Sequence, residues 1–363
     1  MEQPQRTRFF DFTPAEWTAQ VTGWGWPAFR ARQVLAWVYG KLETDVRNMT
    51  DLSAAQRQFL AERVAFADGR IVADQLSTDG TRKLLIEWAP TPLQPRGAHA
   101  ETVMIPDRDR RTACVSSQVG CPVGCRFCAS GVGGVKGNLT SGQIVEQFFH
   151  LSRLLAPEKL TNVVFMGMGE PLANYAEVMK AIRTLHDPQA FHFGARRITV
   201  STVGVPQRIR QLADEDLPLN LAISLHAPSE PIRRELIPWA EHFSIDEILD
   251  AARYYFQKTG REITLEYILL AGVNDRPEHA RALAKVCQSL RANVNLLRYN
   301  EVAGTPFRRP TADDVVVFQD VLRHNGVNAH VRKSRGRDID AACGQLRKKR
   351  EDGQLVPLGV PTT

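Results

Sequence analysis

The stretch Cys121-Pro-Val-Gly-Cys125-Arg-Phe-Cys128 places three cysteines at a C-x3-C-x2-C spacing. Three thiolates can bind three irons of a [4Fe–4S] cluster, which leaves the fourth iron open to a small molecule. A structural zinc site instead completes four ligands from Cys and His, and no His lies within fifteen residues of the triplet. A zinc knuckle and three buried structural cysteines are the alternatives, and the spacing favours the cluster.

Length and composition limit the class of protein that carries this triplet. The chain has 363 residues, 43% of them hydrophobic, which is enough for one large domain or two ordinary ones. Six cysteines without an apolar leader predict a cytoplasmic protein with metal or redox chemistry rather than disulfides. The sequence has no apolar run of about 18 residues, so we expect no membrane span. The net charge of +6 suits a polyanionic partner.

From about residue 111, short apolar runs alternate with amphipathic segments. The expected strands are Thr112–Ser116, Asn162–Met166, Arg197–Ser201, Leu219–Ser224, Ile263–Leu269 and Asn293–Leu297. The expected helices are 141–155, 175–185, 205–213, 246–258, 278–290 and 312–324. Strand–helix repetition predicts a parallel sheet with right-handed crossovers. The fold class is therefore α/β, with a partial (β/α)6 barrel rather than the complete eight units.

Three other segments flank this barrel. Residues 1–66 contain amphipathic patterns and predict a small helical N-terminal domain that helps to hold a nucleic acid. Residues 67–105 predict a β-hairpin extension and linker, because Asp79-Gly80 separates two apolar runs. We assign residues 106–346 to the barrel and a C-terminal catalytic loop, and residues 347–363 to a disordered basic tail.

Polar and glycine residues follow the expected strands, at the end where barrels carry their active sites. The segment Gly167-Met-Gly-Glu170-Pro171 closes the second strand, and its glycines allow the backbone to approach a ligand closely. Ser201, Ser224 and Asn300 follow later strands, where each is either a ligand contact or a strand-end cap. His226 is equally a ligand contact or a core histidine.

Four motifs together resemble the RlmN/Cfr family of radical S-adenosylmethionine (SAM) RNA adenine methyltransferases. They are Cys114-Val-Ser-Ser-Gln-Val-Gly-Cys121, Gly167-Met-Gly-Glu-Pro171, Ser224-Leu-His-Ala-Pro228 and Asp338-Ile-Asp-Ala-Ala-Cys-Gly-Gln-Leu346. The similarity extends from about Ala28 to Leu346. One position departs from the family pattern, since Gly137 stands where the family usually has an arginine.

The resemblance implies a role for each residue of the motifs. It implies Cys121, Cys125 and Cys128 as ligands of the [4Fe–4S] cluster. It implies Cys343 as the cysteine that carries the methyl group, Cys114 as its resolving partner, and Glu101 as the proton acceptor. The positions that match SAM contacts are Gly169, Glu170, Ser201, Ser224, Leu225, His226 and Asn300.

The implied chemistry explains why two cysteines lie outside the triplet. Carbons C2 and C8 of adenine are electron-poor and do not attack the methyl group of SAM, whereas a thiolate does. One SAM methylates Cys343, and a second is cleaved by one electron at the cluster to a radical that activates this methyl group. Glu101 then takes the ring proton, and Cys114 releases the product by forming a disulfide with Cys343. Each turnover consumes two SAM molecules.

The resemblance also implies the partners. We expect methylation of adenine C2 in 23S ribosomal RNA, and in transfer RNA as well. The alternatives are a Cfr-type C8 methyltransferase and a non-enzymatic iron–sulfur or zinc protein that binds RNA. We expect a monomer that receives electrons from a flavodoxin- or ferredoxin-like protein. The candidate phosphate contacts are Arg82, Lys83, Arg108, Arg110, Arg111, Arg196, Arg197, Arg332, Lys333, Arg335 and Arg337.

Overall fold

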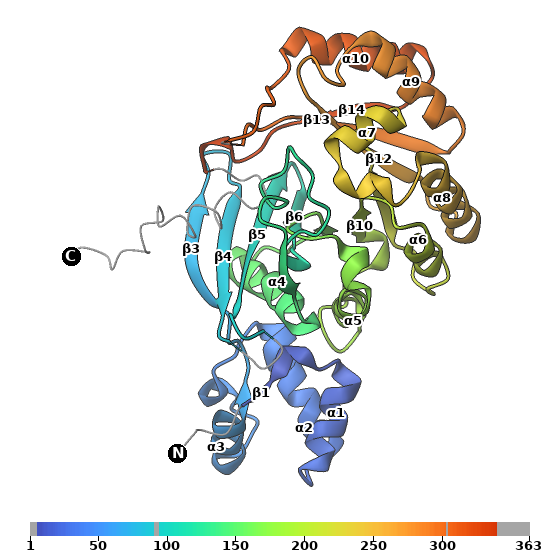
Figure 1. Ribbon diagram of the computed structural model, residues 1–363. Helices are drawn as coiled ribbons and strands as arrows, with labels where there is room; N and C mark the ends of the chain where they lie inside the picture. The colour runs from blue at the N-terminus through green and yellow to red at the C-terminus, as the bar shows by residue number, and fades with distance from the viewer. Residues whose placement is uncertain (1–5, 91–93, 303, 340–363) are drawn as a thin grey trace, which may run out of the picture.

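The protein was analysed as a computed structural model that describes residues 6–90, 94–302 and 304–339. Its centre is a ten-stranded sheet in the order β14-β13-β12-β11-β10-β9-β6-β5-β4-β3. Helices cover the outer side of the parallel part, and a small helical unit lies at one end of the molecule (Figure 1). Among the described residues, no helix is long and apolar enough to cross a membrane.

The parallel part of the sheet confirms the expected partial barrel. Its strands are β6 (Arg110–Cys114), β9 (Asn162–Phe165), β10 (Ile198–Thr202), β11 (Asn220–Ser224), β12 (Ile263–Leu269), β13 (Ala292–Arg298) and β14 (Ala329–Arg332). The connecting helices are α4 (Ser141–Leu155), α5 (Tyr175–His186), α6 (Pro206–Ala213), α7 (Glu230–Leu236), α8 (Ile245–Thr259), α9 (Pro277–Gln288) and α10 (Ala312–His324). Strand β14 was not expected, and it adds a parallel edge beside β13.

The extension continues the same sheet with antiparallel strands. Strands β3 (Arg70–Leu76) and β4 (Arg82–Trp88) form the expected hairpin, with Leu76 opposite Arg82. Strand β5 (Ala98–Asp107) begins inside the stretch 67–105, which the sequence predicted as a hairpin extension and linker. Because β5 pairs with both β4 and β6, the extension and the barrel share one sheet across position 105. The division into domains stays a prediction.

The N-terminal unit is built around aromatic side chains. Its helices are α1 (Pro14–Gly23), α2 (Ala28–Leu35) and α3 (Ala54–Arg63), and its strands β1 (Thr7–Arg8) and β2 (Val64–Ala65) pair in parallel. Trp17 is fully buried, and Trp24 packs edge-on against it with ring centroids 5.6 Å apart. These rings therefore stabilise the unit from inside.

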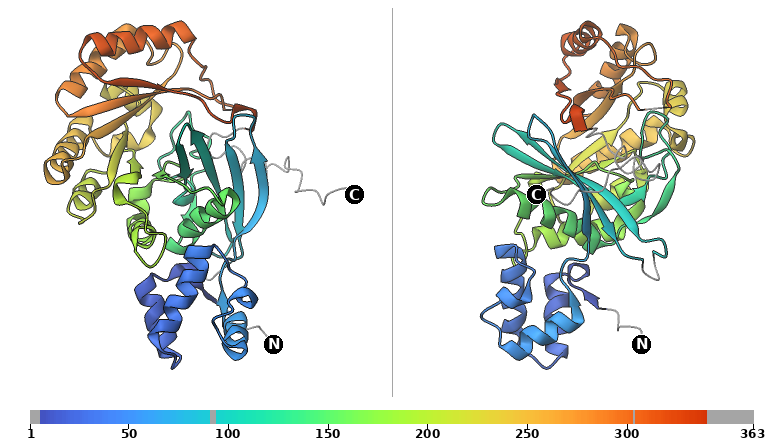
Figure 2. Two further views of the ribbon diagram at one scale, coloured as in Figure 1. Left: turned by 180° about the vertical axis from the view of Figure 1, so that it is seen from behind. Right: turned by 90° about the vertical axis from the view of Figure 1, so that its left-hand side faces the viewer.

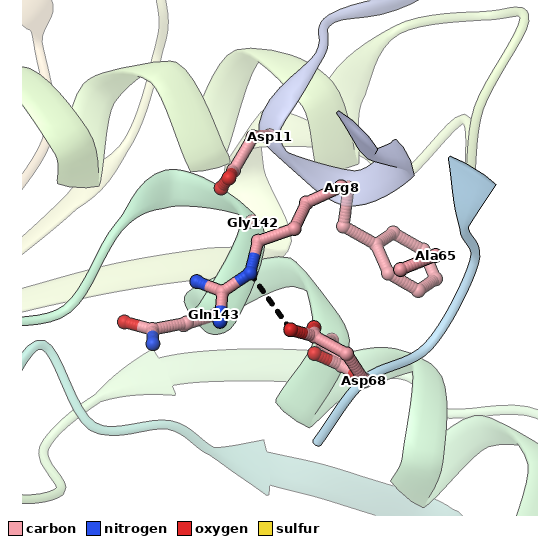
Figure 3. Close-up of a pocket in the computed structure, with 8 residues that line it drawn as sticks. Arg8, Asp11, Ala65, Asp68, Gly142 and Gln143 are labelled. Carbon is pink, nitrogen blue, oxygen red and sulfur yellow. Dashed lines mark ion pairs between the residues drawn. The ribbon is translucent and has the colours of Figure 1, made fainter. Parts of the chain in front are cut away.

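Contacts between α4 and the chain near β1 and β2 join this unit to the barrel. The rings of Phe10 and Phe149 lie 5.1 Å apart, and Thr140 donates a hydrogen bond of 2.8 Å to Asp11. Close by, Arg8 pairs with Asp68 at 2.7 Å in a small pocket (Figure 3). The unit is thus held by apolar and charged contacts together.

The last described segment links the two edges of the sheet. Strand β14 lies at one edge, and the residues after it reach the β3–β4 turn at the other edge (Figures 1 and 2). Asp338 accepts hydrogen bonds from Ser77 Oγ at 2.5 Å and from the Thr78 N–H at 3.0 Å. Arg335 pairs with Asp107 at the end of β5, at 2.8 Å. We call the segment Arg335–Ile339 the C-terminal clasp.

Candidate functional site

The three cysteines lie in the loop between the short strands β7 (Gln118–Gly120) and β8 (Val135–Asn138). All three are half-buried and pack against an apolar cluster. We call it the cysteine-loop cluster, and its buried members are Val123, Phe127, Ala129, Val203, Leu236, Ile237, Ala240, Leu270, Tyr299 and Val302. Gly120 has a φ of +78°, and a Cβ atom there would lie 2.1 Å from the Gly134 carbonyl oxygen, so only glycine allows this tight loop.

The surroundings of the thiols fit a bound iron–sulfur cluster. Burial raises the pKa of Cys121 to about 12 and that of Cys125 well above its usual range, and Cys128 adds to both shifts. Among the described residues, no group of three or more Cys, His, Asp or Glu side chains is placed so that it could hold a metal ion as it stands. The three thiols nevertheless influence one another electrostatically, and thiols lose their protons to a bound metal. Three sulfur donors match such a cluster and fall short of four-coordinate structural zinc.

Glu170 lies beside the cysteine loop as a buried carboxylate. It is 3% exposed and accepts hydrogen bonds from the N–H groups of Leu172 at 3.0 Å and Val203 at 2.8 Å. Burial raises its pKa to about 7. Within the described ranges it forms no ion pair with a Lys, Arg or His. The site therefore offers a fixed carboxylate to a cationic group of a ligand.

Two glycines allow the segment that carries Glu170 to lie against the strand before the cysteine loop. A Cβ atom on Gly167 would lie 2.6 Å from Ser116 Oγ. Gly169 has a φ of +105°, and a Cβ atom there would lie 2.7 Å from Gln118 Cβ. The Gln118 side chain in turn accepts a hydrogen bond of 2.8 Å from the Glu170 N–H. The sequence motif thus reflects close packing of backbone against backbone.

The other expected ligand contacts lie at the ends of β10, β11 and β13. The hydroxyl groups of Ser201 and Ser224 are 3.3 Å apart across adjacent strands. Leu225 follows them and is buried. Asn300 is placed by Arg309, which donates a hydrogen bond of 3.0 Å to its side-chain oxygen. The structure therefore brings these residues to the same end of the sheet as Glu170.

His226 contacts the cysteine loop directly. Its ring packs edge-on against Phe127 with centroids 5.2 Å apart, and its Nδ1 accepts a hydrogen bond of 3.2 Å from the Ile268 N–H. Burial, and then the charge of Arg233, lowers the pKa of His226 to about 3. The ring is therefore neutral and carries its proton on Nε2. The burial agrees with the core-histidine interpretation, and the contact of His226 with a ligand stays a prediction.

A second group of polar residues lies where the extension joins the barrel. Cys114 ends β6 and is buried, and it is opposite Val103 of β5, which is opposite Lys83 of β4. Residues opposite each other, and residues two apart along a strand, share a face of the sheet. Cys114, Glu101 and Lys83 therefore lie on the same face.

Lys83 and Glu101 form a buried ion pair on this face. Their Nζ and Oε2 atoms are 2.8 Å apart, and the two side chains are 0% and 3% exposed. The prediction of Lys83 as a phosphate contact is therefore wrong, because the side chain does not reach the surface. Sequence reasoning missed its role because Arg82-Lys83 resembles a surface basic pair, although the apolar residues that follow indicate a buried strand.

Ser116 connects the two groups. Its hydroxyl donates to the Glu101 carbonyl oxygen at 2.6 Å and accepts from the Met168 N–H at 2.9 Å. The strand with Glu101, the end of β6 and the Gly-Glu-Pro segment are thus fixed relative to one another. Cys343 lies outside the described residues, which end with the C-terminal clasp.

Comparisons with known proteins agree with this site. The family model of the radical SAM superfamily matches residues 115–284. A solved radical SAM methyltransferase from Sphaerobacter thermophilus matches with a TM-score of 0.89 and 42% identity, over 93% of this chain and 98% of that chain. The fold is therefore that of a radical SAM methyltransferase, a class that uses SAM and a [4Fe–4S] cluster.

Further matches narrow the class to one family. Residues 7–65 match the ribosomal RNA large subunit methyltransferase N-terminal domain. Relatives named probable dual-specificity RNA methyltransferase RlmN are 43% identical in Rhodopirellula baltica, over 90% of this chain and 86% of the relative, and 45% identical in Symbiobacterium thermophilum, over 90% and 87%. A relative of the same name in Thermotoga neapolitana is 43% identical over 94% of this chain and 97% of the relative. The chain belongs to the RlmN family of radical SAM RNA methyltransferases.

Proposed function

We propose that this protein methylates C2 of an adenosine in 23S ribosomal RNA, and an adenosine of transfer RNA, through a methylated Cys343. The observation that carries this proposal is Glu170, a buried carboxylate beside three clustered thiols. Such an acid suits the ammonium group of SAM, and three thiols leave one iron of the cluster open to the rest of its amino acid end. The names of the relatives support the two RNA substrates.

The residues divide into a binding group and a reacting group. Cys121, Cys125 and Cys128 would hold the cluster, which when bound supplies the electron for reductive cleavage of SAM. Glu170 would accept hydrogen bonds from the SAM ammonium, and Gly169 keeps the adjacent backbone close. The proposed SAM contacts of the remaining strand ends are Ser201, Ser224, Leu225, His226 and Asn300.

The reacting group transfers the methyl carbon. The Cys343 thiolate attacks the methyl group of one SAM, so a new sulfur–carbon bond forms as the old one breaks. After this carbon has joined the adenine ring, Glu101 accepts the ring proton. The Cys114 thiolate then attacks the Cys343 sulfur, so a disulfide forms as the bond between this sulfur and the methylene carbon breaks. The released carbon keeps the electron pair and takes up a proton, which completes the methyl group on the base. Cys114 and Glu101 share a face of the sheet, which supports the proposal that they act on the same adduct.

The partners follow from this chemistry. A second SAM per turnover and a flavodoxin- or ferredoxin-like electron donor complete the reaction, which we assign to a monomer in the cytoplasm. Exposed basic residues that suit RNA phosphates are Arg108, Arg110, Arg196, Arg197, Arg332 and Lys333. Arg82, Arg111 and Arg335 are instead engaged with Asp74, Glu158 and Asp107.

Mass spectrometry of nucleosides tests the proposed reaction. Anaerobically reconstituted protein, SAM and a reductant are incubated with unmodified 23S ribosomal RNA and with transfer RNA. We expect 2-methyladenosine in both RNAs and none with Cys343→Ala. Formation of 8-methyladenosine would assign the protein to the Cfr-type alternative, and RNA binding without methylation would leave only the non-enzymatic one.

A further inference from the structure

Arg233 is a buried guanidinium on α7 that lacks a carboxylate partner in the described part of the chain. It is 1% exposed. Its Nη2 donates to the Val203 carbonyl oxygen at 2.7 Å and its Nη1 to that of Phe243 at 3.4 Å, whereas its Nε has no hydrogen-bond partner. A buried cation destabilises a protein unless an anion compensates it. The described residues place no Asp or Glu oxygen within 4.0 Å of this guanidinium.

The nearest acid on the same helix is engaged elsewhere. Glu230 lies one helical turn before Arg233 and influences it electrostatically. One oxygen of Glu230 accepts a hydrogen bond from the Ile245 N–H, and the other lies 3.9 Å from Arg234 Nε. Glu230 therefore acts on the Arg233 charge from a distance and forms no direct ion pair with it.

The cysteine loop is packed against the helix that carries Arg233. The Arg126 N–H, next to Cys125, donates a hydrogen bond of 3.0 Å to the Leu236 carbonyl oxygen at the end of α7. Leu236 belongs to the cysteine-loop cluster. Val203, whose carbonyl oxygen accepts a hydrogen bond from Arg233, belongs to the same cluster, against which Cys121, Cys125 and Cys128 pack. The guanidinium is thus within electrostatic reach of the proposed cluster ligands.

One residue also connects Arg233 with the proposed SAM site. The Val203 carbonyl oxygen accepts from Arg233, and the Val203 N–H donates to Glu170 at 2.8 Å. The guanidinium therefore fixes the backbone that orients Glu170, but its positive charge lies behind this backbone rather than on the carboxylate.

We propose that Arg233 is the fixed counter-charge of the cysteine-bound cluster and stabilises its reduced form. A [4Fe–4S] core of charge two plus on three thiolates carries one net negative charge, and the added electron makes it two. A nearby positive charge therefore stabilises the reduced state more than the oxidised one. This inference rests on the proposed ligation by Cys121, Cys125 and Cys128.

The midpoint potential of the cluster tests the role of the charge. In Arg233→Gln, amide donors remain and the charge is lost. A unit charge lost from a protein interior a few ångströms away changes a one-electron equilibrium about tenfold or more. We therefore expect the midpoint potential of the reconstituted full chain, titrated with dithionite and mediators and followed by electron paramagnetic resonance, to fall by about 59 mV or more.

Two further variants separate charge from packing. Arg233→Lys keeps the charge and should keep most of the wild-type potential. Arg234→Gln, at the exposed neighbouring position, should leave the potential unchanged. An Arg233→Gln protein with full iron content and the wild-type midpoint potential would overturn the counter-charge role. The proposed function would remain intact in that case, because the three cysteines would still hold a cluster.

Iron content decides the case in which the neutral variant does not hold a cluster. Arg233→Met, which fills the apolar volume, is then added. If Arg233→Gln and Arg233→Met lose iron and Arg233→Lys keeps it, the result supports the need for a positive charge beside the cluster. Loss from all three would show a purely structural arginine. Zinc instead of iron in the wild type would overturn the proposed function itself.

Discussion

At the scale of single residues, Glu170 distinguishes a ligand site from a buried structural acid. A structural acid would be paired, whereas Glu170 accepts only hydrogen bonds that the described residues supply from backbone and hydroxyl groups. We expect Glu170→Gln to weaken SAM binding about 10- to 100-fold, since one charge-assisted hydrogen bond contributes about 1.5–3 kcal/mol. Equilibrium dialysis of labelled SAM with reconstituted protein measures this, with the exposed Glu241→Gln as the control. Equal affinity in both variants would remove Glu170 from the site.

Cys114 is the residue whose late role separates it from the other thiols. It is buried beside Glu101 and outside the cysteine loop, so its replacement should not affect cluster assembly. Cys114→Ala should still load Cys343 with a methyl group and attack RNA, and then remain joined to the RNA because no thiol resolves the adduct. We expect a nuclease-trimmed protein–nucleotide adduct by denaturing electrophoresis and mass spectrometry.

The matched control for this experiment is the double variant. The adduct should be absent from Cys114→Ala/Cys343→Ala, because no methyl carrier remains. The Cys287→Ala variant removes a buried thiol of α9 and should turn over normally. Normal turnover of Cys114→Ala would instead make Cys114 a structural strand residue.

At the scale of secondary-structure elements, local signals explain which predictions succeeded. Helix α4 lies at residues 141–155, where its amphipathic pattern predicted it, and the structure adds a capping box of Thr140 and Gln143 at its start. The start of β5 was missed because prolines precede it and its partners, β4 and β6, are chosen by pairing rather than by local sequence. Strand β14 has only four residues and depends on β13 in the same way.

In the candidate site, too, features with a local sequence signal were predicted and features set by tertiary contacts were missed. The cysteine spacing and the Gly-Glu-Pro motif each lie within a few consecutive residues, so the sequence predicted them. Lys83 follows Arg82 and Arg233 precedes Arg234, so each resembles part of a surface basic pair. The apolar residues after Lys83 indicate a buried strand, whereas no local signal marks Arg233 as buried. The pairing of β4 with β5 and the packing of α7 on the cysteine loop show that these two cations are buried.

The C-terminal clasp is the element that leads toward Cys343. Asp338 contacts the β3–β4 turn through Ser77 and Thr78, and these hydrogen bonds hold its pKa below the usual range. We expect Asp338→Ala to increase hydrogen exchange at the Thr78 amide severalfold and to slow methyl loading of Cys343, because the segment before this cysteine loses its anchor. Exchange mass spectrometry and intact-protein mass measure the two effects. Asp320→Ala, on the exposed side of α10, should change neither.

At the scale of the whole molecule, the helical unit is fixed to the barrel through a group of acids. Asp11, Asp68 and Glu146 line the pocket between them, with Arg8 as the cation (Figure 3). Glu146 also accepts hydrogen bonds from the Gly69 N–H at 2.8 Å and from Trp88 Nε1 at 2.6 Å. A change in the protonation of these acids therefore changes the stability of the contacts that hold the helical unit to the barrel.

The pH dependence of stability follows from the sign of the shift at Asp68. Burial, and then the charge of Glu146, raises the pKa of Asp68 from 3.8 to about 6. The folded state therefore binds the proton more tightly, so this contribution to stability is fully present below about pH 4 and is lost as the pH rises through about 6. In thermal unfolding from pH 4 to 7, the difference in Tm between wild type and Asp68→Asn should change across this window and level off above it. The exposed Asp216→Asn should parallel the wild type, and an Asp68→Asn curve that also runs parallel would show that Asp68 titrates normally in the folded protein.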